Sequence, residues 1–126
     1  DMSADGEYIV AGTDQGEEDN DNNLYLWKKD SSTPIWIYDT GYSDWDDGGL
    51  SISADGEYIV AGSHDDKVYL FDKDSNTPLW SYTTGDEVWS VAISADGEYI
   101  VAGTTGWNSN GENKTYFFNK ASNNPL

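Results

Sequence analysis

Short apolar segments alternate with polar turns along the whole chain. Ten residues, SADGEYIVAG, occur three times, at 3–12, 53–62 and 94–103. Apolar segments such as VYLF (68–71) and VWSVAI (88–93) follow or precede them. These segments are rich in Val, Ile, Tyr and Trp, which favour strands, and turn sequences such as ADG and DSNTP separate them. Because no window shows apolar residues at helical spacing over three turns, the pattern predicts an all-β protein.

Each repeat is expected to form four strands, which we call a to d. Their sequences are, in order, VWSVAI, EYIVAG, VYLFDK and PLWSYT. Strand c has no polar side over Val68–Phe71, so both of its faces should be covered by other sheets. Strand d alternates and places Trp80 and Tyr82 on one side. A period of about 41 residues is typical of one blade of a β-propeller.

Two known repeat families resemble these segments. Residues 88–103 joined to 63–72 resemble a WD40 repeat, and the c–d segments, with Trp36 and Trp80 after Y-L-(W/F)-x-K-D-S-x-T-P, resemble the quinoprotein (PQQ-type) repeat. Both resemblances imply a β-propeller made of four-stranded antiparallel blades. The recurring ADG is then the hairpin turn between strands a and b, because Gly tolerates a positive φ.

The blades are expected at about 1–40, 48–84 and 88–126, and the third lacks its last strand. Three blades are too few to close a ring, since four to eight are typical. The chain is therefore either a segment of a longer propeller or completes its ring by self-association, in which two chains would give six blades. Exposed end blades would otherwise aggregate, so we expect self-association.

The length variation falls on one face of the expected ring. The a–b turns and the c–d links keep constant lengths. In the b–c loops, by contrast, Leu24 follows Gly12 by 12 positions, whereas Val68 follows Gly62 by six. The d–a crossings also differ in length. Binding residues commonly lie on loops held by a rigid scaffold. We therefore expect a binding or interaction scaffold with its ligand or protein partner on the face that carries the b–c and d–a loops.

Aromatic and acidic residues are interspersed in these loops. They suit sugar stacking, a cation held against an aromatic ring, or a basic protein partner. In the alternative interpretation, Trp45 and Trp107 fold back and cover their own loops. The candidate binding residues are Tyr42, Asp44, Trp45, Asp46, Asp47, Asp86, Glu87 and Trp107.

Composition restricts the partners. The formal net charge is −18, the six basic residues are all Lys, and Cys is absent. Phosphate binding depends on clustered cations, so the charge argues against nucleic acid and anionic membrane surfaces. It fits either a solvated surface or a face selected for cations and basic partners. The compartment stays open, with an extracytoplasmic location as one option.

No catalytic residue is predicted. His64 is the only histidine, and no nucleophile motif accompanies it, so a structural role is expected. The alternative is a fragment of a propeller enzyme, such as a quinoprotein-like oxidoreductase or a glycan-processing protein. No cofactor is predicted, although Asp19, Asp21 and Asn23 alternate as in a calcium loop. Because Leu24 stands where that loop needs Gly, calcium is the weaker alternative.

Overall fold

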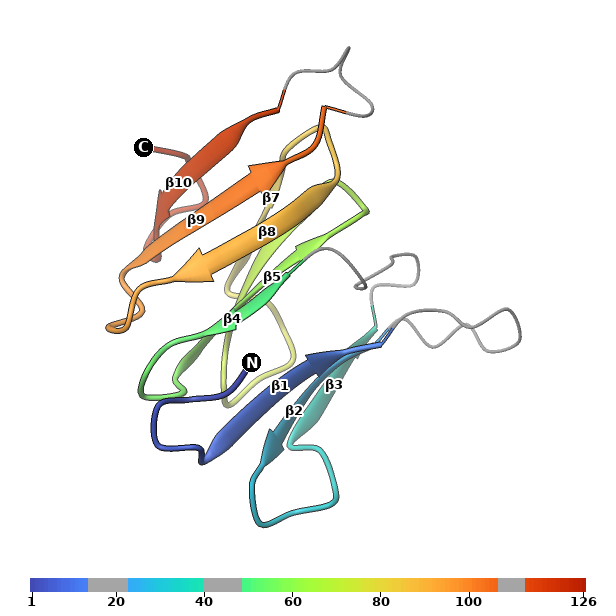
Figure 1. The fold of residues 1–126 in the computed structure, drawn as a ribbon, viewed down its shortest axis with the longest axis vertical. Coiled ribbons are helices and arrows are strands. Elements are labelled where there is room, and N and C mark those ends of the chain that lie inside the picture. The colour runs from blue at the N-terminus through green and yellow to red at the C-terminus, as the bar shows by residue number, and fades with distance from the viewer. Residues whose placement is uncertain (14–22, 40–48, 107–112) are drawn as a thin grey trace, which may run out of the picture.

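A computed structural model describes residues 1–13, 23–39, 49–106 and 113–126. These residues form three antiparallel sheets (Figure 1), which confirms the predicted all-β fold, and among them no helix could cross a membrane. The strands are β1 (Tyr8–Gly12), β2 (Asn23–Lys28), β3 (Trp36–Asp39), β4 (Leu50–Ile52), β5 (Tyr58–Ser63), β6 (Lys67–Asp72), β7 (Trp80–Thr83), β8 (Val88–Ile93), β9 (Tyr99–Thr104) and β10 (Thr115–Asn119).

Each sheet is a meander in which neighbouring strands are consecutive in the chain. We call the sheets blade 1 (β1-β2-β3), blade 2 (β4-β5-β6-β7) and blade 3 (β8-β9-β10). They stack side by side in chain order, with blade 2 in the middle (Figure 1). Only blade 2 shows all four expected strands within the described residues. The strand a of blade 1 is reduced to one bridge, between Met2 and Ile9.

The repeated decapeptide builds the same turn in every blade. In blade 2 the Ser53 hydroxyl donates to Asp55 Oδ1 at 2.6 Å and accepts from the Tyr58 amide at 3.0 Å. The same carboxylate oxygen accepts from the Glu57 amide at 3.0 Å, and Gly56 has a φ of 75°. Corresponding bonds occur in the turns of blades 1 and 3. The ADG segment is therefore a structural turn, as predicted.

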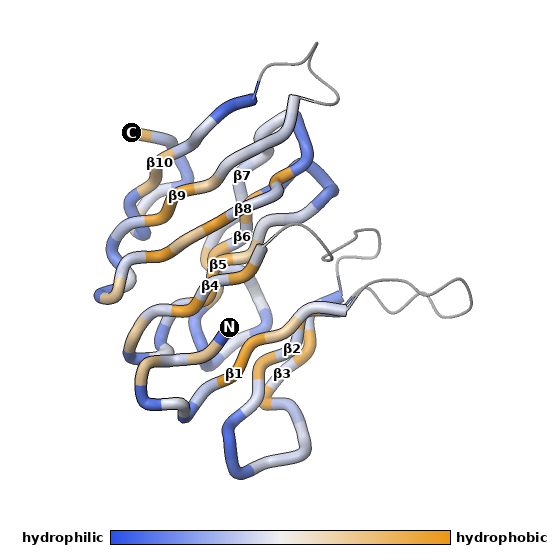
Figure 2. The backbone as a smooth tube through the Cα atoms, in the orientation of Figure 1, coloured by the Kyte–Doolittle hydropathy of each residue, from blue (hydrophilic) through white to orange (hydrophobic). Residues whose placement is uncertain are grey.

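The hydrophobic core consists of two layers, one at each junction between blades. Hydrophobic positions are concentrated along the strands (Figure 2). Successive residues of a blade 2 strand enter opposite layers, so that Ile59 faces blade 1 and Val60 faces blade 3. Residues Val68–Phe71 are all buried, which confirms that both faces of this strand are covered. Trp80 and Tyr82 pack against the second layer, as the alternation in strand d predicted.

Directed hydrogen bonds link each blade to the next. The Ala4 amide donates to Ala54 O at 2.9 Å, and the Ala54 amide donates to Ala95 O at 3.0 Å. Two indole groups act in the same direction: Trp36 Nε1 donates to Lys73 O at 2.9 Å, and Trp80 Nε1 donates to Lys120 O at 2.7 Å. Both junctions therefore have the same polar contacts and the same polarity.

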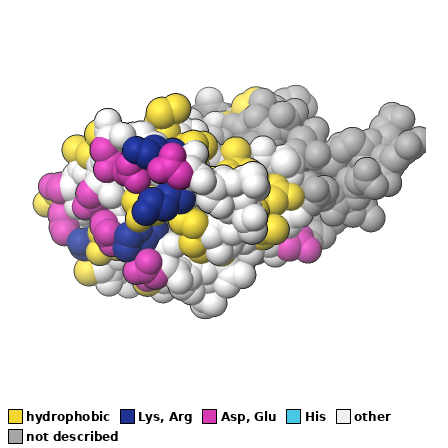
Figure 3. Space-filling view, turned by 90° about the horizontal axis from the view of Figure 1, so that it is seen from below, with side chains coloured by type: hydrophobic (Ala, Val, Ile, Leu, Met, Phe, Trp, Pro, Cys, Tyr) yellow, Lys and Arg dark blue, Asp and Glu magenta, His cyan; other side chains and the backbone are white. Residues whose placement is uncertain are grey.

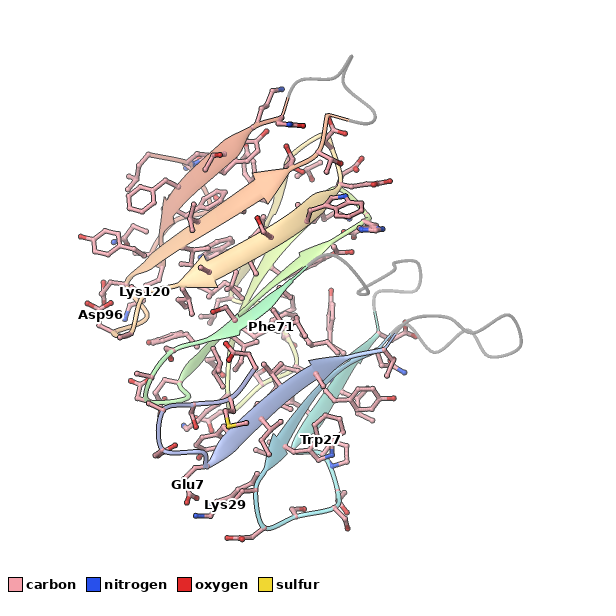
Figure 4. The ribbon with its side chains drawn as sticks, viewed as in Figure 1. Glu7, Trp27, Lys29, Phe71, Asp96 and Lys120 are labelled. Carbon is pink, nitrogen blue, oxygen red and sulfur yellow. The ribbon has the colours of Figure 1, made fainter. Side chains whose placement is uncertain are left out.

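Most lysines lie at the edge of the molecule that carries the a–b turns and c–d links. Lys29, Lys73 and Lys120 form ion pairs with Glu7, Glu57 and Glu98, at 3.1 Å in the second pair and 2.7 Å in the third. Figure 4 shows the Glu7–Lys29 pair in blade 1 and Lys120 in blade 3. Viewed from below, Lys and acidic side chains gather on one side (Figure 3). In each blade, one glutamate of this edge is therefore paired with a lysine.

Candidate functional site

The b–c loops and the d–a link come together at the opposite edge, which we call the loop face. Its described part contains the b–c hairpin of blade 2 (His64–Asp66), the d–a link (Thr84–Glu87) and the start of β8. In Figure 1 these segments lie on the right-hand side. This is the face on which the sequence predicts a partner.

The b–c hairpin of blade 2 is short and fixed. Ser63 pairs with Lys67, which leaves three residues in the loop. The last of them, Asp66, has a φ of 65°, and three-residue hairpin loops commonly place one residue in this left-handed region. Asp is among the few residues that enter this region readily. The hairpin therefore holds His64 at a defined position on the loop face.

Asp65 anchors this hairpin to the strand below it. Its Oδ2 accepts from Lys67 Nζ at 2.8 Å and from the Tyr69 hydroxyl at 2.5 Å. Burial of Tyr69, together with the negative charge of Asp65, raises the pKa of the Tyr69 hydroxyl. The phenol therefore stays protonated and continues to donate to the carboxylate at physiological pH.

The d–a link ties blade 2 to blade 3. The Thr84 amide donates to Asp66 O at 2.8 Å, and the Tyr116 hydroxyl donates to Thr84 O at 2.8 Å. Further along the link, the Thr105 amide donates to Glu87 O at 3.1 Å. Hydrogen bonds therefore connect blades 2 and 3 at the base of the loop face.

Trp89 is turned outward by a β-bulge. The pairing of β8 with β9 shifts between Val88 and Ser90, so that Trp89 has no partner on β9. A bulge redirects the side chain of the extra residue. The Trp89 side chain is 37% exposed and stacks on the His64 ring, with the ring centroids 5.4 Å apart. Its Nε1 lies 3.4 Å from Glu87 Oε2.

The two acidic candidates within the described residues, Asp86 and Glu87, differ in burial. Glu87 lies beside the exposed Trp89, whereas Asp86 is only 2% exposed, so its carboxylate is inside the molecule. The predicted structural role of His64 agrees with its contact across the blade junction. The other candidates lie outside the described residues: Tyr42, Asp44, Trp45, Asp46, Asp47 and Trp107.

Sequence analysis missed Trp89 as a surface residue. Simple alternation in VWSVAI places Trp89 on the same side as Val91 and Ile93, which pack against the core layer between blades 2 and 3. The bulge breaks this alternation, and no Gly or Pro in the segment marks its position. One feature of the sequence could have indicated that Trp89 lies on the loop face: it comes directly after the acidic d–a link.

The residues of the calcium alternative lie mostly outside the described segments. Asn23 begins β2, where its amide donates to Thr13 Oγ1 at 3.2 Å, while Asp19 and Asp21 lie outside the described residues. In the described segments, no group of three or more His, Asp or Glu side chains could hold a metal ion.

The WD40 family model (WD domain, G-beta repeat) matches residues 48–72 and 76–110. This chain is built of WD40-like β-propeller blades. The matched residues include the four strands of blade 2 and the first two of blade 3. Of the two resemblances seen in the sequence, the WD40 repeat is the one that this match supports.

A solved structure shows the same fold. The chain superposes on the β-propeller domain of Cps50 (Swd1) from Myceliophteria thermophila with a TM-score of 0.77 at 12% identity. The match covers 100% of this chain and 36% of that one, so the WD40-like blades span about a third of the longer propeller. No curated protein matches the sequence. The architecture shared by the two chains is that of a β-propeller.

Proposed function

We propose that this chain belongs to a WD40-like scaffold that binds a basic segment of a partner protein on its loop face, without turnover. The observation that carries the proposal is the exposed Trp89, stacked on His64 and flanked by Glu87. An aromatic face next to a carboxylate has the chemistry that an Arg or Lys side chain requires, because the ring attracts the cation and the carboxylate pairs with it.

The charge distribution favours a cation on this face. Four of the six lysines, Lys28, Lys29, Lys73 and Lys120, lie at the opposite edge near the c–d links. On the loop face, Lys67 is already bound to Asp65, and Lys114 lies exposed directly before β10. With a net charge of −18, the chain attracts cations in general, and the loop face has few free cations of its own to repel them.

The fixed geometry of the site also supports binding. The bulge at Trp89 and the stacked His64 hold the indole in place before a ligand arrives, and the short His64–Asp66 hairpin restricts the imidazole. Less side-chain freedom is then lost on binding than at a mobile site. Whether Tyr42, Asp44, Trp45, Asp46, Asp47 and Trp107 add to this surface stays a prediction.

A titration with a short Arg-Gly repeat peptide tests this function, followed by tryptophan fluorescence and calorimetry. We expect saturable binding that weakens about tenfold in Trp89→Ala, since a desolvated cation–aromatic contact contributes on the order of 1–2 kcal/mol. Glu87→Gln should weaken binding and reduce its salt dependence.

The matched control is Asp30→Asn, which removes one negative charge from the exposed c–d turn at the other edge. It should leave the affinity unchanged. Equal losses in Glu87→Gln and Asp30→Asn would mean that the peptide senses only net charge, which would contradict a defined site. Saturable binding of a neutral oligosaccharide, with none of the peptide, would replace the basic partner by a glycan.

A further inference from the structure

We propose that a second copy of this chain docks head to tail on the first, with the outer face of blade 3 against the outer face of blade 1 and Tyr99 seated over Gly6 of the other copy. The outer faces are the sheet faces of the end blades that point away from blade 2. Neither is the loop face, so the inference is independent of the proposed function.

A tyrosine covers a glycine at both internal junctions. A Cβ added to Gly56 would lie 2.5 Å from Tyr8 Cδ2, and one added to Gly97 would lie 2.5 Å from Tyr58 Cδ2. Both glycines are buried by the tyrosine of the preceding blade. The ring thus occupies the space that any side chain at the turn would fill.

Gly6 and Tyr99, the two remaining members of this pattern, lie in the first and the last blade, and neither has a partner of this kind among the described residues. Gly6 has no atom within 4 Å of its Cβ position, and Tyr99 is 46% exposed. Tyr99 corresponds to Tyr58 and Tyr8, and Gly6 corresponds to Gly56 and Gly97. One end of the chain therefore offers the ring, and the other end offers the glycine that fits it.

Blade 3 exposes the apolar side chains that its neighbours bury. Val101 occupies the position of Val10 and Val60, which are buried, yet it is 38% exposed. Its strand neighbour Phe117 is 45% exposed and pairs with Val101 in the ladder. The stacked rings of Tyr99 and Phe117 complete this apolar surface, with their centroids 5.6 Å apart.

Blade 1 carries the other half of the same interface. Ile9 pairs with Trp27 as Ile59 pairs with Phe71. Ile59 and Phe71 are fully buried against blade 1. Trp27 faces away from blade 2 (Figure 4), and both it and its ladder partner Ile9 remain half-buried. Met2, at the position of the buried Ile52, is exposed on the same side.

A hollow on the outer face of blade 3 lies where strand a of a following blade would pack. It has a volume of about 200 Å³. On blade 2 the corresponding surface, over β4 and β5, is covered by β8 of blade 3. The segment around Met2 of a second copy has the position of β8 and would enter this hollow. The lining residues are Ser90, Val91, Ala92, Val101, Gly103 and Thr115.

Polar groups match in the same orientation. The Ala95 amide has no backbone acceptor among the described residues, whereas the corresponding amides of Ala4 and Ala54 donate to the next blade. At the junction of blades 2 and 3, Lys120 Nζ lies 4.5 Å from the centroid of the Tyr58 ring. Lys29 of the second copy would take this position over Tyr99. Complementary patches on opposite ends of one chain produce a head-to-tail interface, which forms rings where the rotation closes.

Sedimentation of the chain over a range of concentrations tests the inference. We expect the mass to rise from that of one chain to that of two or more. Gly6→Asn should weaken association at least about tenfold, because Asn tolerates the positive φ of Gly6 but collides with Tyr99 of the other copy. Gly85→Asn is the matched control: its φ is 82°, no atom lies within 4 Å of its Cβ position, and it should associate normally.

A second variant separates head-to-tail pairing from other arrangements. Val101→Glu places a charge on the outer face of blade 3, and it should also give single chains with an unchanged far-ultraviolet spectrum. A mixture of Gly6→Asn and Val101→Glu chains retains one intact interface and should form pairs. Monomeric wild-type chain at every concentration would overturn the inference, as would association that Val101→Glu abolishes and Gly6→Asn leaves intact, since two blade 3 faces would then be in contact.

Discussion

Blade 2 and blade 3 contain the same ten residues, yet they bury them differently. In blade 2 both Ile59 and Val60 are fully buried, whereas in blade 3 Ile100 is buried and Val101 is exposed. The b strands, their pairing with strand c and their a–b turns are alike, so the sequence of this strand does not decide its burial. What decides it is whether a further blade lies against that face.

The comparison shows where the stability of this fold resides. The pairing of strands b and c is continuous in blades 1 and 3 as it is in blade 2. Among the described residues, the hydrophobic layers lie at the two junctions, as in repeat proteins whose units gain most of their stability from their neighbours. Substitutions at junctions should therefore be costly, and equivalent substitutions on outer faces should not.

The largest expected effect is at Phe71. Phe71→Ala removes a fully buried ring between blades 1 and 2 and should lower the free energy of unfolding by about 3–5 kcal/mol. Phe117→Ala, on the outer face of blade 3, should change it by no more than about 0.5 kcal/mol in dilute single chains. Denaturant unfolding followed by fluorescence measures both. Equal losses would contradict the division between junctions and outer faces.

Glycines in the a–b turns give an intermediate effect. Gly6 and Gly56 both have positive φ, so Ala at either position costs roughly 1–2 kcal/mol in backbone strain. Gly56→Ala should cost roughly 1–3 kcal/mol more, because its Cβ would overlap the Tyr8 ring and push blade 1 away. Thermal unfolding of the two variants gives the difference. If they unfold at the same temperature, Tyr8 does not pack tightly on this turn.

The smallest expected effect comes from the aspartates of the a–b turns, and it should be the same in every blade. Bonds from the Ser53 hydroxyl and the Glu57 amide lower the pKa of Asp55, and equivalent bonds lower the pKa of Asp5 and Asp96. A carboxyl whose pKa is lower in the folded protein stabilises the fold at pH values above the pKa it has in the unfolded chain, about 4. This contribution is lost as the pH falls through the lower pKa of the folded protein.

Single Asp→Asn variants at these three positions should therefore lose a similar, small part of the acid sensitivity of unfolding. Stability measured from neutral pH down to about pH 2 tests this expectation. Because these bonds lie within one blade, a larger effect at Asp55 than at Asp96 would show that a neighbouring blade does influence the turn.

Most of the fold could be predicted from the sequence. The triplicated SADGEYIVAG gave the period, and the unbroken apolar run Val68–Phe71 indicated a sheet covered on both sides. The site was harder to predict, because it depends on details that alternation does not encode. The bulge turns Trp89 outward, and the d–a link places Asp86 inside while Glu87 stays half-buried beside Trp89. The contact between His64 and Trp89 joins two blades and has no local signal in either segment.

The one-way bonds between Ala4, Ala54 and Ala95 have an evolutionary consequence. Every blade presents a donor to its successor and an acceptor to its predecessor, so the same bond can recur at each added junction. Tandem duplication or deletion within the gene would then alter the circumference of the assembly without redesigning any surface. Duplication of this kind would produce near-identical copies such as the three SADGEYIVAG segments.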